Sequence, residues 1–192
     1  MAKYLRETLI NLQSGDLDLV SLYEYIKQEI NSRGNVAAGD YDLFRSGKAR
    51  RALVLYKASG GAGDPIILSD VAAALELLRL GLLKHFSAKA ARYGLPPENT
   101  RLVLADAYYA RALGIVVALG DTTLVRILCD ALASASEGYA GPDNEESRSL
   151  RNSLEKAAFT IGCYISGRQE GEKSSFMTIV EEVDSAVFAH PS

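Results

Sequence analysis

The chain of 192 residues contains no tryptophan, only five prolines and only two histidines. Alanine and leucine are common instead, and this composition favours helices over strands. Neither sign of charge dominates: the net charge of −3 gives no reason to expect nucleic acid or an anionic membrane as a partner. The sequence also lacks a run of about 18 or more apolar residues, so we expect no transmembrane span.

Cysteine is scarce as well. Cys129 and Cys163 stand in apolar helical patterns and lack the spacing of a metal site. We therefore expect two buried free thiols in a reducing compartment. Lys3, Arg6 and Glu7 interrupt the first turns, which is not typical of a signal peptide. The expected location is cytoplasmic.

What the chain does contain is helical periodicity, most clearly between Asp64 and Ala91. Pro65 fits the first turn of a helix, with Asp64 or Ser69 as its cap. Apolar residues then occupy nearly every side of the expected helix, which is typical of a helix buried in a larger bundle. We expect the other helices to pack around this one.

The same periodicity predicts about eight helices, and no segment has the alternation of a convincing strand. Short breaks rich in glycine, proline and aspartate separate the helices. This rhythm predicts an all-α fold: a single-domain antiparallel bundle over residues 1–192, with N-terminal helices in residues 1–45. The expected helices span residues 2–13, 16–32, 47–58, 65–91, 98–119, 121–137, 143–166 and 172–188.

No local pattern specifies an active site by itself. The sequence lacks a Ser–His–Asp set, a phosphate-binding loop and a zinc signature. His85 and His190 stand alone, and a single histidine near a helix end is more often structural than catalytic. The basic cluster of Lys48, Arg50 and Arg51 can bind an anion, although a solvated basic turn is the commoner reason for such a cluster.

Several segments together resemble the trans-polyprenyl diphosphate synthase family, whose members have the all-α isoprenoid synthase fold. Gly47, Lys48 and Arg51 are similar to the G-K-x-x-R-P segment of that family, with Ala52 in place of the proline. Further similar segments lie at residues 71–85, 104–113, 131–138 and 154–162, where Asp106, Glu137, Gly138 and Lys156 match. The region of resemblance is residues 46–190, and it implies a truncated isoprenoid synthase fold.

The chain departs from the family where the first D-D-x-x-D motif should stand. Residues 86–90 read Phe–Ser–Ala–Lys–Ala, so all three acids are missing, and the sequence stops about where the second motif should begin. In this chemistry, carboxylates bind the Mg²⁺ ions, and these ions neutralise the charge of the leaving diphosphate. The resemblance therefore implies no catalytic residue, no metal site and no bound cofactor in this chain, with Mg²⁺ on a catalytic partner.

Family members that lack both motifs are small subunits of two-component synthases, such as the heptaprenyl and hexaprenyl enzymes. The resemblance implies a non-catalytic or regulatory subunit of a heterodimeric medium- or long-chain synthase, serving menaquinone side-chain biosynthesis. A full-length catalytic subunit would be its partner, and isoprenoid diphosphates its ligands. The resemblance implies that the helices within residues 101–138 form the contact, because they match the helices that the family uses as its dimer interface. They are also apolar on more faces than one bundle needs, although a fully internal core helix would have the same pattern.

The resemblance also assigns individual residues. Lys48, Arg51 and Arg79 are candidates for binding a diphosphate. Lys48 and Arg51 stand near the expected start of a helix, where cations suit a multiply charged anion. Gly81 and Leu82 come just before the missing acids, where the family sets the depth of its product tunnel. We expect these two residues to line a tunnel.

Two other functions stay open. One is a homodimeric isoprenoid-binding or regulatory protein that keeps the fold without the chemistry, and a homodimer is also an option for the chain alone. The other is a stand-alone enzyme that uses scattered acids such as Asp70, Glu76 or Asp106. These acids lack the paired spacing of a metal site, which disfavours the second option.

Overall fold

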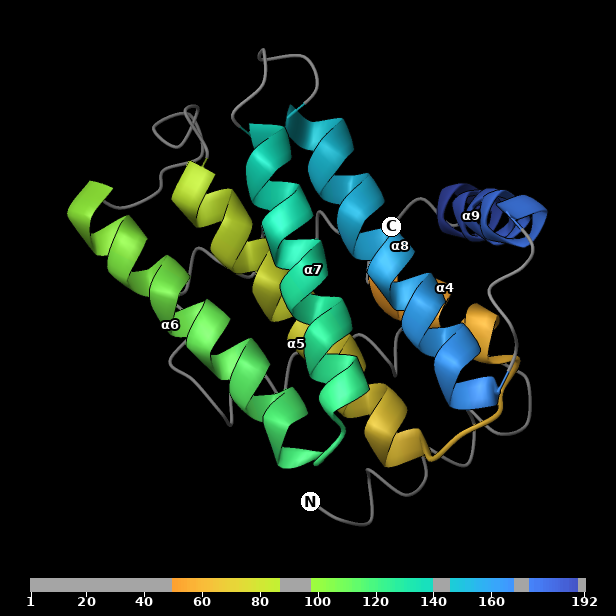
Figure 1. Ribbon diagram of the computed structural model, residues 1–192. Helices are drawn as coiled ribbons and strands as arrows, with labels where there is room; N and C mark the ends of the chain where they lie inside the picture. Colours follow the sequence, from red (N-terminus) through yellow and green to blue (C-terminus); the bar gives the residue numbers. More distant parts are fainter. Residues whose placement is uncertain (1–49, 87–97, 140–145, 168–172, 190–192) are drawn as a thin grey trace.

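The computed structural model describes residues 50–86, 98–139, 146–167 and 173–189. These ranges hold six helices and no strand, packed into a bundle (Figure 1). The helices are α4 (Arg50–Ser59), α5 (Pro65–Phe86), α6 (Glu98–Ala118), α7 (Thr122–Tyr139), α8 (Glu146–Ser166) and α9 (Lys173–Ala189). The expected all-α fold is confirmed. The structure describes six helices where about eight were expected, because the two helices expected before residue 47 lie outside the described residues. None of the six is both long and apolar enough to cross a bilayer.

The central helix of the bundle is α5, which contacts α4, α6, α7 and α8. Pro65 is its first residue, and the Asp64 carboxylate caps it by accepting a hydrogen bond from the Ile66 amide at 2.8 Å. Every residue from Leu68 to Leu82 is buried, so Ser69 lies inside the helix and is not its cap. Apolar residues on nearly every side of this helix predicted that it would be buried in the bundle, and the structure confirms this.

A tight turn joins α6 to α7. Gly120 adopts a φ of +73°, which suits glycine, and Asp121 then caps α7 through the Thr123 amide at 2.8 Å. Because α6 packs chiefly against α5 and lies at one edge of the bundle (Figure 1), its outer face stays exposed. Val103 and Val117 on that face are 69% and 59% exposed, so α6 is not an internal core helix.

Close packing joins α4 to α8. At their contact a Cβ on Gly162 would fall 2.6 Å from both the Ala58 Cβ and the Leu55 carbonyl oxygen, so only glycine fits there. The last helix, α9, lies at one side of the bundle against α4 (Figure 1). An edge-to-face contact between Phe159 and Phe176, with ring centroids 5.3 Å apart, also ties α9 to α8.

The two cysteines have different environments. Cys163 on α8 is a buried free thiol, as expected. Cys129 on α7 is exposed, so the expectation of a buried thiol is wrong there. Leu128 and Ala131 are buried on the inner side of α7, and Cys129 lies one residue further round the helix from Leu128, which turns it toward solvent.

Candidate functional site

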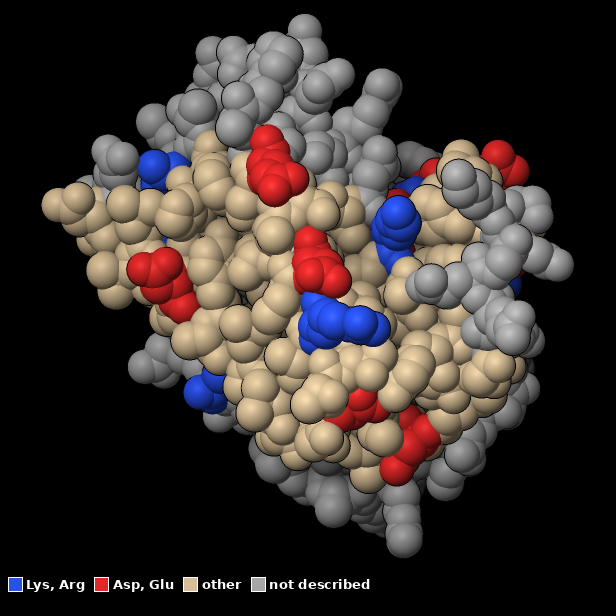
Figure 2. Space-filling model, in the orientation of Figure 1, with Lys and Arg blue, Asp and Glu red and all other residues tan. Residues whose placement is uncertain are grey.

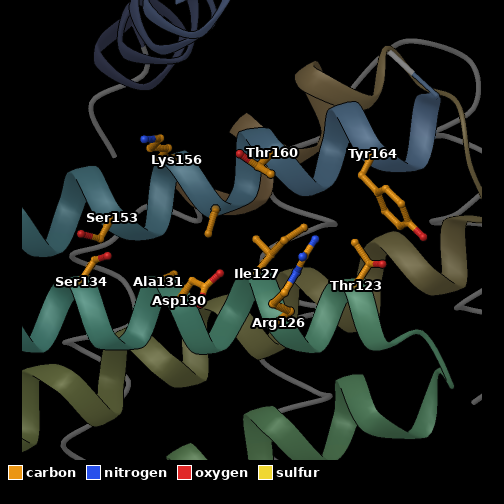
Figure 3. Close-up of a pocket in the computed structure, with 11 residues that line it drawn as sticks. Thr123, Arg126, Ile127, Asp130, Ala131, Ser134, Ser153, Lys156, Thr160 and Tyr164 are labelled. Carbon is orange, nitrogen blue, oxygen red and sulfur yellow. The ribbon is translucent and has the colours of Figure 1, made fainter. Parts of the chain in front are cut away.

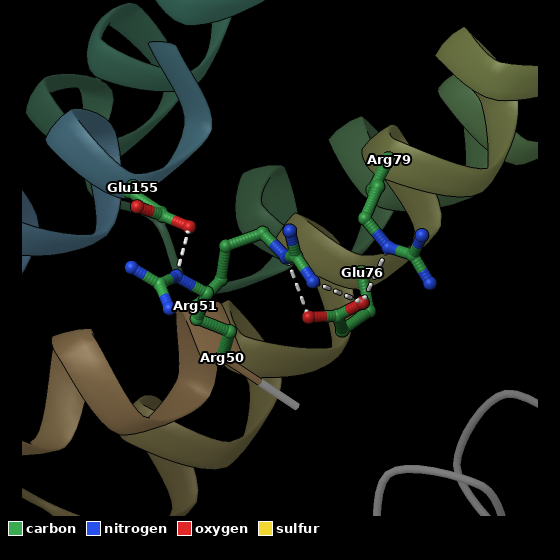
Figure 4. Close-up of polar contacts among 5 residues, drawn as sticks. All are labelled: Arg50, Arg51, Glu76, Arg79 and Glu155. Atoms are coloured by element: carbon green, nitrogen blue, oxygen red, sulfur yellow. Dashed lines mark hydrogen bonds and ion pairs between the residues drawn. The ribbon is translucent and has the colours of Figure 1, made fainter. Parts of the chain in front are cut away.

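The residues expected to bind a diphosphate come from the start of α4 and the middle of α5. Arg51 and Arg79 meet at the carboxylate of Glu76 (Figure 4), with Arg51 Nε 2.6 Å from Oε1 and Arg79 Nε 3.1 Å from Oε2. All three side chains are buried. Lys48, the third expected residue, lies outside the described residues. The structure thus brings two of the three together and gives both a carboxylate partner.

The neighbouring Arg50 joins three helices. Its Nε donates to Glu155 Oε1 of α8 at 2.5 Å (Figure 4), and its Nη1 pairs with Asp184 of α9. Glu155 is buried, and a buried carboxylate needs a cation or several donors beside it. Arg50 therefore has a structural role at the junction of α4, α8 and α9, which the sequence did not reveal.

The two residues expected to line a tunnel lie near the C-terminal end of α5. Leu82 is fully buried, and Gly81 faces the ring of Tyr109 on α6, where an added Cβ would fall 2.5 Å from Cε1. The ring of His85 lies 4.6 Å from that of Phe86 and 6.1 Å from that of Tyr109, measured between centroids. Aromatic side chains therefore surround this end of α5.

The acids considered for a stand-alone enzyme lie in different environments. Glu76 is held by two arginines, Asp70 is buried near the start of α5, and Asp106 is exposed on the outer face of α6. Within the described ranges, no group of three or more His, Cys, Asp or Glu residues is arranged to hold a metal ion.

A second candidate site is a groove between α7 and α8 (Figure 3). Its volume is about 660 Å³, within the range of small-molecule sites. Charge comes from Arg126 and Asp130 on α7 and from Lys156 on α8. Hydroxyl groups come from Thr123, Ser134, Ser153, Thr160 and Tyr164. The groove therefore offers hydrogen-bond donors and both signs of charge to a ligand.

One end of the groove is fixed by a hydrogen bond. The Tyr164 hydroxyl donates to Asp121 Oδ2 at 2.9 Å, while the Thr123 and Leu124 amides donate to Oδ1. Desolvation alone would raise the pKa of Asp121, but these hydrogen bonds outweigh it and hold the pKa below its usual 3.8. The bond between Asp121 and Tyr164 thereby ties the start of α7 to the end of α8.

The lining of the groove is both polar and apolar. Ile127, Ala131 and Ala157 supply apolar lining beside the polar groups, a combination that suits a small amphipathic ligand. Lys156 matches a motif of the resemblance, but neither Lys156 nor Arg126 was predicted to be a site residue. The sequence did contain a pattern that could have indicated this side of the groove, because polar residues 123, 126, 130 and 134 lie on one side of α7. Only the packing of the helices shows that this side of α7 faces α8.

Comparisons with known proteins support the fold. The sequence matches no protein-family model and no curated protein. The crystal structure of a decaprenyl diphosphate synthase from Rhodobacter capsulatus matches with a TM-score of 0.63 at 20% sequence identity. The match covers 95% of this chain but 65% of that synthase, so the chain spans less than two thirds of its length. This likeness shows that the chain has an isoprenoid synthase-like fold.

Proposed function

We propose that this chain is a non-catalytic or regulatory subunit of a heterodimeric medium- or long-chain trans-polyprenyl diphosphate synthase. It would set product length and complete an active complex for menaquinone side-chain biosynthesis. One observation carries the proposal: a fold shared with a decaprenyl diphosphate synthase is combined with Phe86, Ser87 and Ala90 where the family has the three acids of its first motif.

The residue types at that place do not fit Mg²⁺. Magnesium takes oxygen ligands, usually carboxylates, whereas residues 86–90 offer a ring, a hydroxyl, two methyl groups and an ammonium. We therefore assign this chain no step of the reaction. In the proposal the catalytic partner holds Mg²⁺ and condenses isopentenyl diphosphate with an allylic diphosphate.

The outer surface of α6 and α7 supports the proposed contact with that partner. Val103 and Val117 expose most of their surface to water, and burying such apolar side chains favours association. Figure 2 shows that the face carrying these helices is largely uncharged, with a few scattered acidic and basic groups. A second helical chain can cover such a face without burying many charges.

Product length is the contribution we propose for the end of α5. Gly81 and Leu82 would border the product tunnel, and Tyr109, whose ring lies against Gly81, would limit its depth. In the complex, Tyr109→Leu should then lengthen the products. Met177→Leu is the control, because Met177 is an exposed residue on α9, away from α5 and from the groove; it should leave product length unchanged.

Co-expression with the full-length synthase from the same genome tests the proposal. We expect a stable one-to-one complex, with Mg²⁺-dependent long-chain product from the complex and none from this chain alone. Val117→Arg should weaken the complex, whereas Met177→Arg, at an equally exposed apolar residue on α9, should not. Product made by the chain alone, or failure to bind the synthase, would contradict the proposal.

The groove between α7 and α8 favours a second candidate function, a homodimeric isoprenoid-binding protein without chemistry. Arg126 and Lys156 beside an apolar lining suit a ligand with an anionic head and an apolar tail. This candidate predicts a homodimer that ignores the synthase and binds an isoprenoid diphosphate. Arg126→Ala should then weaken binding, measured by calorimetry, while Cys129→Ala, a nearby exposed residue outside the groove, should not.

A further inference from the structure

The last helix, α9, contacts the bundle through one narrow face. Phe176, Ile179 and Val183 follow one another at helical spacing along this face and pack against the core. Among the side chains of α9 that the structure describes, only Val183 is buried. The main contact of α9 is with α4, at one side of the bundle (Figure 1). Little apolar surface therefore holds α9 in place.

An acid on each side of Val183 pairs with a cation of α4. Glu182 lies 3.1 Å from the ammonium of Lys57, and Asp184 pairs with Arg50. Positions 50 and 57 are two helical turns apart, so the two cations share one side of α4. The sequence Glu–Val–Asp thus places an apolar residue between two acids, and each acid meets its own cation.

Release of α9 would leave the buried acid of the α4–α8 contact paired. Besides Asp184, Arg50 binds Glu155 of α8, with Nε 2.5 Å from Oε1. Glu155 is buried, and it keeps this cation when Asp184 departs. The pair of Lys57 with Glu182 is about half exposed, and such pairs contribute little to stability. These contacts allow α9 to detach while the rest of the bundle stays folded.

The surface beneath α9 also has an aromatic ring. The ring of Phe159 on α8 packs edge to face on that of Phe176, with centroids 5.3 Å apart, and Phe159 is 7% exposed. Release of α9 would uncover this ring on the side of the bundle where α9 pairs with Arg50 and Lys57. We call Arg50, Lys57 and Phe159 the α9 seat. A ring and two cations suit a helix with an apolar face and acidic flanks.

We propose that α9 is a releasable strap, and that the α9 seat binds an acidic amphipathic helix of another protein in its place. The contacts of α9 define that helix: an aromatic residue, then seven positions later an apolar residue with an acid on each side. Charge complementarity with Arg50 and Lys57 favours such a segment over a basic or neutral one. Because α9 is tethered beside its seat, it competes at a high effective concentration and keeps the affinity for the partner low until it is released.

This inference goes beyond the proposed function and does not depend on it. The helices α6 and α9 lie at opposite edges of the bundle (Figure 1). A synthase subunit bound at α6 would therefore leave the α9 seat accessible, and the chain can bind both proteins at once.

Fluorescence anisotropy with a labelled peptide of residues 173–189 tests the α9 seat on the full chain. The peptide carries the aromatic residue and the two acids that define the proposed partner helix. In a chain with both Glu182→Lys and Asp184→Lys, α9 meets like charges and should leave its seat. We expect the peptide to bind this double variant about tenfold or more tightly than it binds wild type, because the competing α9 is removed.

Charge changes in the peptide show whether the seat recognises the two acids. A peptide with Glu182→Lys and Asp184→Lys should lose binding to the double variant. Glu181→Lys in the peptide is the matched control, because Glu181 is an exposed acid of α9 that forms no ion pair with another described residue. This control peptide should bind as the wild-type peptide does.

Hydrogen exchange separates release of α9 from unfolding. In the double variant the amides of α9 should lose protection, while those of α5 keep it. Equal binding of the peptide by wild type and variant, binding by neither, or loss of protection in both helices would each overturn the proposal. Dissociation of a wild-type dimer by the peptide would also overturn it, because the seat would then belong to α9 of a second copy.

Discussion

Arg51 of α4 and Glu76 of α5 make a two-point contact inside the bundle, with Nε 2.6 Å from Oε1 and Nη2 3.3 Å from Oε2. Both side chains are almost excluded from water. A buried ion pair is costly to break on one side, because the remaining charge stays buried without its counter-charge. The contact therefore holds α4 against the central helix.

Glu76→Gln should lower the free energy of unfolding by about 3 kcal/mol or more, because it leaves two buried guanidinium groups facing a neutral amide. Urea denaturation measures this loss. The matched control is Glu182→Gln, which removes a pair with Lys57 at 3.1 Å whose side chains are both about half exposed. That substitution should cost less than about 1 kcal/mol. Equal losses would show that burial does not determine the strength of these pairs.

The same substitution at two helical glycines should change stability in opposite directions. Gly162→Ala places a Cβ 2.6 Å from the Leu55 carbonyl oxygen, so α4 and α8 must separate, at a cost of about 1–3 kcal/mol. Gly114→Ala meets open space and removes the flexibility of a mid-helix glycine, which should add about 0.5–1 kcal/mol. Thermal unfolding followed by circular dichroism distinguishes the two; a shift of both melting temperatures in one direction would contradict this account.

The pKa of Asp121 leads to a pH dependence. Because this pKa is lower in the folded chain than the usual 3.8, the carboxylate stabilises the fold above that pH, and the contribution is lost as the pH falls through the folded value. Tyr164→Phe removes one of its hydrogen bonds. The variant should be less stable than wild type at pH 7 by under about 1 kcal/mol, with the difference shrinking toward pH 3. A difference that persists unchanged at pH 3 would point to lost packing instead.

Helix positions could be predicted from the sequence because their signals are local. Pro65 with Asp64 marks the start of α5, and Gly120 with Asp121 separates α6 from α7. Caps and turns depend on neighbouring residues, so they can be recognised without knowing the tertiary structure. The all-α fold follows from the same signals.

The contacts between helices could not be predicted in this way. Glu76 is an isolated acid on an apolar helix in the sequence, and only packing brings Arg51, 25 positions earlier, to its carboxylate. Arg126 likewise belongs to a periodic polar side of α7, but that side becomes part of a groove only because α8 lies opposite. Cys129 was misjudged because apolar neighbours along the chain do not reveal which side of a helix faces the core.

Charged contacts help to hold α9 in place. Two ion pairs link it to α4, Arg50 with Asp184 and Lys57 with Glu182, while Val183 is its fully buried apolar residue among the side chains described. Exposed pairs weaken as salt shortens the screening length, which falls to about 3 Å at 1 M. The attachment of α9 should therefore depend on ionic strength more than the core does.

Hydrogen–deuterium exchange at low and high salt measures this difference. Amides of residues 173–189 should exchange severalfold faster in 1 M sodium chloride, while those of the buried α5 should change little, because local opening follows local stability. Arg50→Gln should produce the faster exchange in α9 already at low salt, since it removes the pair with Asp184. Lys57→Gln should have a smaller effect, because its pair is half exposed. If α5 and α9 instead respond together to salt, then α9 opens only when the whole bundle unfolds, and its charged contacts do not set its attachment.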